Sequence, residues 1–348
     1  MASARVRRPG GPEDQGLPVA VDAMGGDKAP GEIVAGAVQA ASELQVPVVL
    51  VGRSADLGDT GGLEVVEASE VVAMDEDPAS AVRRKKDSSL VRAAEAVRDG
   101  RALAMVSAGN TGAAMASALL RMGRLPGVTR PAIATPIPRP GTSPTVLLDA
   151  GANTECTAAM LVQFAQMGAT YASARYGPAD PSVALLSIGE EPTKGTPLVK
   201  EAHAAIEEAA ASGAFRFVGN VEGRDLLPGT ADVVVTDGFT GNVALKTLEG
   251  ALRFFMDALA GILGHDDSTR AAADALLPYL APLAAEFDPD NTGGAMLLGV
   301  DGVCVISHGS SSARAVVSAV RVAHDLAEAG LVGRLAEVTA SRGGAPSR

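Results

Sequence analysis

The sequence contains no tryptophan, and its 348 residues include only three tyrosines and seven phenylalanines. Lysine and arginine together number 29 against 41 acidic residues, so the formal net charge is −12. Proteins that bind nucleic acids need basic patches and aromatic rings that stack on bases. This composition argues against a nucleic-acid partner and favours chemistry on a small molecule.

Cysteine and histidine are also scarce. Cys156 and Cys304 lie far apart and match no zinc or redox spacing, so we expect two buried thiols. The four histidines are scattered and form no ligand pair at helical spacing. The chain contains no P-loop, GxGxxG, GxSxG or HExxH motif. The sequence therefore predicts neither a metal nor a nucleotide cofactor, and it argues against a catalytic triad.

Long apolar runs are missing as well. None reaches the roughly 18 residues that a membrane-spanning helix needs, and residues 1–16 lack the apolar stretch of a signal peptide. We therefore expect a cytoplasmic protein. Residues 1–16 mix charge, glycine and proline without periodicity, which predicts a disordered arm. We expect one domain over residues 17–335 and a flexible tail over 336–348.

Short apolar runs alternate with Ala-rich stretches of helical spacing from Leu17 onward. The runs are VAVDA, VPVVLVG, LAMVSAG, PTVLLDAGA, SVALLSIG, ADVVVTDG and GVCVISHG. Continuous apolar runs are typical of parallel strands covered on both faces by helices. The sequence predicts an α/β fold of three layers around a mostly parallel sheet.

Most of these runs end in glycine and small polar residues, as in MGGD, SAGNTG, DAGAN, SIGEE, TDGFTGN and SHGSSS. Ligands collect at the carboxyl ends of the strands in open parallel sheets, and helix N-termini there favour anions. We expect these loops to gather at one edge of the sheet around an anion.

Residues 249–287 form an amphipathic segment in which one helical face is apolar. Two explanations remain open. The segment is either a pair of core helices, or a protruding pair that docks on a partner subunit, an acyl carrier or a membrane surface.

Several loops resemble, in order, those of one family. They are DAMGGDKAP, RRKKDSS, SAGNTGA, LLDAGAN, SIGEEPTKGT, GNVEGRD, ADVVVTDGFTGNVALKTLEG and GVCVISHGSSSA. The sequence is similar over about Leu17 to Leu335 to the bacterial phosphate acyltransferases of phospholipid synthesis, the PlsX family.

The resemblance implies an acyl transfer from acyl-[acyl-carrier-protein] (acyl-ACP) to inorganic phosphate, which gives acyl phosphate and free carrier. It also implies an isocitrate/isopropylmalate dehydrogenase-like fold related to the phosphotransacetylases, and a homodimer. Peripheral association with the inner face of the cell membrane, near a glycerol-3-phosphate acyltransferase of the PlsY type, is a further implication.

Phosphate is itself an oxygen nucleophile, so attack on a thioester needs no covalent enzyme intermediate. The site must hold phosphate beside the thioester carbon and stabilise the oxyanion. Expected contacts to phosphate or the acyl donor are Lys85, Lys86, Ser88, Ser89, Ser107, Gly109, Asn110, Thr111, Gly112, Asn153 and Gly241. Helix capping by Asn110, Thr111, Asp87, Ser88 or Ser89 is the alternative explanation for the two loops that contain them.

Charge stabilisation is assigned to Lys194 and Lys246, with Asn242 one helical turn before Lys246. Surface ion pairs are the alternative for the lysines. Asp22, Asp27 and Asp237 are candidates to orient the lysines or to accept a proton from phosphate, while Asp27 could instead cap a helix.

Three other functions remain open. The protein could be a phosphotransacetylase that acts on acyl-CoA or a dehydrogenase acting on a phosphorylated hydroxy acid. It could also be a non-catalytic scaffold at a membrane or an acyl carrier.

Overall fold

The computed structural model describes residues 16–340. The predicted arm, apart from Gly16, and residues 341–348 of the predicted tail lie outside the described residues. The helix α11 (Leu331–Ala340) runs past the expected boundary at residue 335, because Ala336 and Thr339 are buried against the rest of the domain.

A single eleven-stranded sheet forms the middle layer, in the order β3-β2-β1-β4-β11-β10-β5-β6-β9-β7-β8. The strands are β1 (Val19–Asp22), β2 (Val48–Gly52), β3 (Glu64–Glu67), β4 (Ala104–Ser107), β5 (Ala132–Ile137), β6 (Thr145–Leu148), β7 (Ser182–Leu186), β8 (Arg216–Val221), β9 (Val233–Val235), β10 (Ala295–Leu298) and β11 (Val303–Ile306). Every predicted apolar run contains one of these strands. The central strands are buried throughout, which explains why their sequences are continuously apolar.

The sheet reverses direction at its centre. Strands β1, β4 and β11 are parallel to one another, and so are β6, β9 and β7. The pairs β11–β10, β10–β5 and β5–β6 between these blocks are antiparallel. An odd number of reversals leaves the two blocks running in opposite directions. The expectation that the strand-end loops share one edge of the sheet is therefore wrong.

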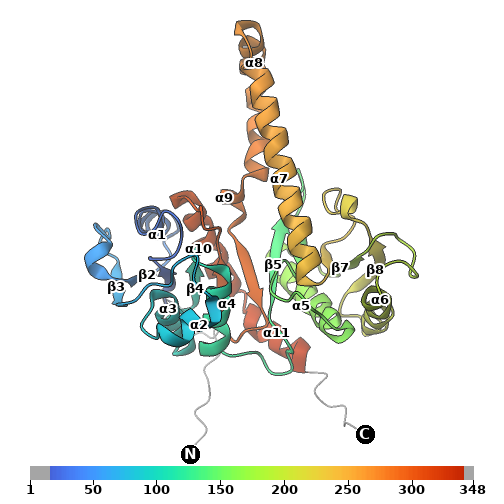
Figure 1. Ribbon diagram of the computed structural model, residues 1–348, viewed down its shortest axis with the longest axis horizontal. Helices are drawn as coiled ribbons and strands as arrows, with labels where there is room; N and C mark the ends of the chain where they lie inside the picture. Colours follow the sequence, from blue (N-terminus) through green and yellow to red (C-terminus); the bar gives the residue numbers. More distant parts are fainter. Residues whose placement is uncertain (1–15, 341–348) are drawn as a thin grey trace, which may run out of the picture.

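Helices cover both faces of the sheet (Figure 1). They are α1 (Gly31–Leu44), α2 (Pro78–Arg84), α3 (Ser89–Arg98), α4 (Thr111–Arg121), α5 (Ala158–Tyr176), α6 (Pro197–Ala210), α7 (Gly238–Leu263), α8 (Asp267–Phe287), α9 (Pro289–Thr292), α10 (Ala313–Glu328) and α11. One hydrophobic cluster joins the sheet to α1, α5, α6, α10 and α11, and a second joins it to α2, α3 and α4. The predicted three-layer α/β fold is confirmed.

Helices α7 and α8 form a hairpin that stands out from the domain (Figure 1). The 26 residues of α7 span about 39 Å, whereas a strand of six residues covers only about 20 Å. The helix therefore extends beyond the sheet. No residue of α8 is buried, so of the two explanations for residues 249–287 the protruding pair is the one observed.

None of the helices within residues 16–340 has both the length and the apolar content that crossing a bilayer requires.

Candidate active site

A buried carboxylate lies where β1 and β4 end side by side. Asp22 pairs in register with Ser107, whose hydroxyl donates to Asp22 Oδ2 at 2.7 Å. The Gly109 backbone N–H donates in turn to Ser107 Oγ at 3.0 Å. Burial raises the pKa of Asp22, although hydrogen bonds from Ser89, Ser107 and Met24 oppose this effect. Predicted site residues from three separate motifs thus meet at one carboxyl group.

Gly25 is required for this contact because there is no room for a side chain. A Cβ atom on Gly25 would lie 2.5 Å from Asp22 Oδ2 and 2.8 Å from the Gly109 nitrogen. The loops after β1 and β4 therefore touch backbone to backbone. We call Asp22, Gly25, Ser89, Ser107 and Gly109 the Asp22 cluster.

The loop after β11 flanks the Asp22 cluster, and no site residue was predicted in it although its motif was recognised. The Ser307 N–H donates to the Ser107 carbonyl at 2.8 Å, and the Asp27 N–H donates to the Gly309 carbonyl at 2.8 Å. His308 is exposed here, and its Nδ1 accepts the Ser310 N–H at 3.3 Å, so a neutral ring carries its proton on Nε2. An imidazole N–H donor is thus available beside the cluster.

Asp27 does not cap a helix. The residue preceding α1 is Pro30, and no side-chain cap is present there. The helix-cap explanation for Asp27 is therefore wrong. Its backbone instead ties the β1 loop to the β11 loop.

The basic run 83–86 divides into inward and outward side chains. Lys85 turns inward, where its Nζ donates to the Val71 carbonyl at 2.6 Å and pairs with Glu76. A hydrogen bond from the Ala73 N–H, and then Lys85, lowers the pKa of Glu76. Arg83, Arg84 and Lys86 are exposed, and among residues 16–340 none of them forms an ion pair within 4.0 Å. Lys85 therefore stabilises the loop, while its neighbours face solvent.

Capping explains part of the two phosphate-binding motifs. Ser88 caps α3 by accepting the Val91 N–H at 3.4 Å. Asn110 caps α4 by accepting the Ala113 N–H at 3.0 Å, and its amide nitrogen donates to the Met74 carbonyl at 2.8 Å. The helix therefore begins at Thr111 and Gly112, whose amides come before the first intrahelical hydrogen bonds.

A second group of predicted residues surrounds Asp149, where β6 ends. Asp149 Oδ1 accepts the N–H groups of Ile133, Gly151 and Ala152 at 2.9–3.1 Å. Asp149 Oδ2 accepts both the backbone N–H and the carboxamide of Asn153 at 2.8 Å. The Asn153 carboxamide also donates to the Pro131 carbonyl. The predicted phosphate ligand Asn153 thus has its side-chain donors committed to the fold.

The start of α7 packs directly on this carboxylate turn. Asp237 caps α7 through the Thr240 N–H at 2.8 Å, and the Gly238 N–H donates to the Asn153 carbonyl at 2.7 Å. A Cβ on Gly241 would overlap the Asp149 carbonyl oxygen, which explains the glycine. Asn242 is exposed and lies over Gly151. We call Asp149, Gly151, Asn153, Gly238 and Gly241 the Asp149 cluster.

The two predicted lysines have different surroundings. Lys246 Nζ bonds Glu249 Oε2 at 2.8 Å, and its side chain is 52% exposed, as in a surface ion pair. Lys194 lies on the loop between β7 and α6, and none of the described residues forms an ion pair with it. Its side-chain stem crosses Gly189, where a Cβ would come within 2.8 Å of Lys194 Cγ.

The predicted residues therefore form two groups on opposite-running blocks of the sheet. Ala152 and Leu245, beside the Asp149 cluster, pack on the same hydrophobic cluster as Met115 and Ala116 of α4. Both groups thus lie beside the helical layer formed by α2, α3 and α4. Their convergence on a single phosphate stays a prediction.

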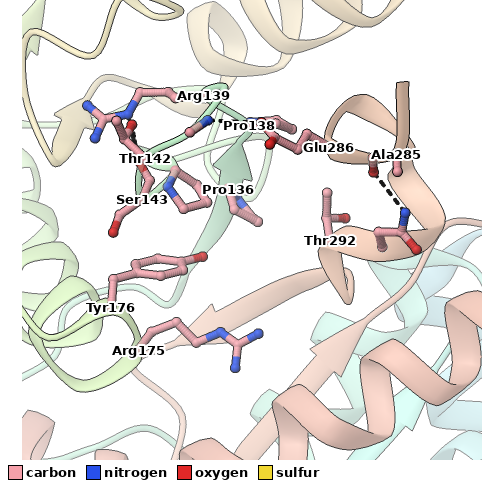
Figure 2. Close-up of a pocket in the computed structure, with 13 residues that line it drawn as sticks. Pro136, Pro138, Arg139, Thr142, Ser143, Arg175, Tyr176, Ala285, Glu286 and Thr292 are labelled. Atoms are coloured by element: carbon pink, nitrogen blue, oxygen red, sulfur yellow. Dashed lines mark hydrogen bonds between the residues drawn. The ribbon is translucent and has the colours of Figure 1, made fainter. Parts of the chain in front are cut away.

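A cavity of about 620 Å³ lies away from both clusters, at the base of the hairpin. Figure 2 shows Tyr176 and Arg175 at the end of α5 facing the β5–β6 connection and the end of α8. None of the predicted site residues lines it. Within residues 16–340, no three His, Cys, Asp or Glu side chains are grouped so that they could hold a metal ion.

Comparison with known proteins identifies the family. The model of the family described as "Fatty acid synthesis protein" matches residues 17–334. The chain belongs to this family. It is 49% identical over 314 residues to a protein from Heliobacterium modesticaldum named phosphate acyltransferase, with 88% of this chain and 92% of the relative covered.

Solved structures show the fold at much lower identity. The EutD phosphotransacetylase from Staphylococcus aureus superposes with a TM-score of 0.59 at 17% identity, covering 89% of this chain and 94% of that one. A putative 4-hydroxythreonine-4-phosphate dehydrogenase from Salmonella typhimurium gives 0.52 at 12% identity, with 90% and 99% covered. The chain thus has the expected fold, which it shares with a phosphotransacetylase and a putative dehydrogenase.

Proposed function

We propose that the protein transfers a fatty acyl group from acyl-ACP to inorganic phosphate, giving acyl phosphate for phospholipid synthesis. The observation that carries the proposal is the similarity, at 49% identity over 88% of the chain, to a relative named phosphate acyltransferase. The loops of the Asp22 cluster offer a site for an anion, as this reaction needs.

The reaction needs no nucleophile from the protein. A phosphate oxygen attacks the thioester carbon, the C–S bond breaks, and the thiolate takes up a proton to leave as free carrier thiol. The two cysteines are poor alternatives. Cys304 is buried as expected, whereas Cys156 is only partly buried, so the expectation of two buried thiols is wrong for Cys156. Burial raises the pKa of Cys156 to about 11 and that of Cys304 to about 12, so both stay protonated near neutral pH.

Phosphate is proposed to bind between the Asp22 cluster and the N-terminus of α4. The amides of Thr111 and Gly112 open that helix, and such N–H groups favour an anion. Lys194, Lys246 and Asn242 are assigned to the acyl donor and its oxyanion, across the helical layer that both clusters border.

The acyl donor is proposed to arrive on an acidic carrier protein. In a chain of net charge −12, the exposed cations Arg83, Arg84 and Lys86 have no described ion-pair partner. They lie next to Lys85 and Glu76, and Asn110 donates to the Glu76 carbonyl at 3.3 Å. An acidic surface docked there would be close to the proposed phosphate site.

The activity is tested by supplying acyl-ACP or acyl-CoA, each with and without phosphate, and detecting acyl phosphate as its hydroxamate. We expect product from acyl-ACP only when phosphate is present. If acyl-CoA with phosphate gives product and acyl-ACP with phosphate does not, the protein is better explained as a phosphotransacetylase. If neither donor gives product, a scaffold is the better explanation.

The docking of the carrier is tested with Arg83→Glu/Arg84→Glu. We expect KM for acyl-ACP to rise about tenfold, in line with the loss of two favourable charges, while kcat stays unchanged. Arg321→Glu on α10 is the matched control. An unchanged KM for acyl-ACP would refute this docking surface.

We extend the proposal to a homodimer that associates peripherally with the inner face of the cell membrane, beside a PlsY-type acyltransferase. The support is the uncovered apolar surface of the hairpin, on which Phe254 is 76% and Tyr279 78% exposed. Light scattering and vesicle flotation of Phe254→Ser/Phe255→Ser test the two roles separately. A variant that remains dimeric and still floats would show that this apolar surface of the hairpin serves neither role.

A further inference from the structure

The loop that carries Lys194 is held by a hydrogen bond from the buried side-chain amide of Asn220. Asn220, on β8, is only 5% exposed, and its Nδ2 donates to the Glu191 carbonyl at 2.9 Å. The same carbonyl accepts the Lys194 N–H at 3.0 Å. One buried side chain thus fixes the carbonyl around which the Lys194 turn closes.

Asn220 is held in turn by His203 of α6. His203 Nδ1 lies 2.9 Å from Asn220 Oδ1, and His203 is 8% exposed. Because the amide nitrogen is used on Glu191, the oxygen must face the imidazole. An amide oxygen only accepts, so His203 Nδ1 carries the proton. This pairing gives Asn220 one orientation.

The backbone of the loop determines where the Lys194 ammonium lies. The lysine stem crosses Gly189, and Gly195 behind it has a φ of +97° that a residue with a side chain would adopt only under strain. A shift of the Glu191 carbonyl therefore moves the lysine with it.

We propose that Asn220, oriented by His203, is a positioning residue that sets Lys194 for acyl transfer. The inference rests on the proposed function, because it gives Lys194 a part in turnover. Burying two polar side chains is costly unless they are hydrogen-bonded. Here the hydrogen bonds of the pair lead to the Lys194 loop.

The test is a double-mutant cycle on kcat with acyl-ACP and phosphate. Asn220→Asp keeps the shape and the acceptor for His203 but removes the donor to Glu191. Misplacement of a catalytic group by 1 Å can cost about 100-fold, so we expect kcat to fall about 10- to 100-fold. Combined with Lys194→Ala, it should lower kcat no further than Lys194→Ala alone, since residues that act as a unit are non-additive.

Controls separate positioning from stability. Ser182→Ala removes a buried hydrogen bond to Asp232 at the other end of β7, so it should lower the urea midpoint and leave kcat unchanged. If Asn220→Asp does not fold, His203→Ala takes its place, and His203→Gln should recover part of the lost kcat by restoring a donor. Additive losses in the double variant, or full turnover by folded Asn220→Asp or Lys194→Ala, would overturn the inference. Failure of the proposed function would appear differently, as absence of acyl phosphate from the wild-type protein.

Discussion

The Ser107 hydroxyl is predicted to be a large single contributor to the stability of the site. It donates to the buried Asp22 carboxyl and accepts the N–H of buried Gly109. Losing a hydrogen bond to a charged group costs about 2 kcal/mol, and leaving a buried amide unpaired costs about 2 kcal/mol more. Ser107→Ala should therefore lower the free energy of unfolding by about 4 kcal/mol, measured by urea denaturation at pH 7.

A matched control is available on α4. The Ser117 hydroxyl is buried without a hydrogen-bond partner among the described residues, so Ser117→Ala should leave stability unchanged or raise it. If Ser107→Ala and Ser117→Ala unfold at the same urea concentration, the reasoning is refuted.

The sign of the pH dependence gives a second check on the same cluster. Burial raises the pKa of Asp22 above 3.8, so the folded state holds this proton more tightly than the unfolded state does. Its contribution to stability is present below pH 3.8 and is lost as the pH rises through the folded pKa. Asp22→Asn should remove that loss. The raised pKa of Asp22 would be contradicted if the stability of the wild-type protein did not fall relative to that of Asp22→Asn as the pH rises from 3.8 through the folded pKa.

Other predictions concern close packing, charge and thiols. Gly25→Ala should lower the melting temperature clearly, because its Cβ would lie 2.5 Å from a carboxylate oxygen, whereas Gly250→Ala, which faces open space on α7, should raise stability by about 1 kcal/mol. Lys246→Ala should reduce turnover by about 10²- to 10³-fold with no loss of stability. Glu249→Ala breaks the same surface ion pair and should preserve turnover. Equal turnover in the two variants would remove Lys246 from the mechanism. Cys156→Ser should retain full activity, and loss of acyl phosphate formation would contradict direct attack by phosphate.

The sequence was sufficient to predict the buried strands but not the reversal of strand direction at the centre of the sheet. Continuous apolar runs identified β1, β4 and β11 correctly, because burial on both faces leaves a strong pattern. The reversal depends on β5 and β10, which are not among the predicted apolar runs. The short GVDG connection between β10 and β11 is the one local signal for an antiparallel turn there.

Local contacts in the site were more predictable than distant ones. Capping by Ser88 and Asn110 follows from residue type at a helix start and was foreseen as an alternative. The contact between Asp22 and Ser107 spans 85 positions and depends on which strands pair. The Asn220 anchor was missed because it joins a strand to a preceding loop through one buried amide, and such pairings leave no periodic trace.

The seating of α7 has a mechanical consequence. The helix is continuous from its first turn, where Gly241 abuts the Asp149 backbone, to a tip about 39 Å away. Because α7 is stiff and held at its N-terminal end, it acts as a lever. A force on the tip of the hairpin therefore produces a torque at the first turn of α7. Binding of a partner at the far end of the hairpin would therefore exert a force on the Gly151 turn, over which Asn242 lies.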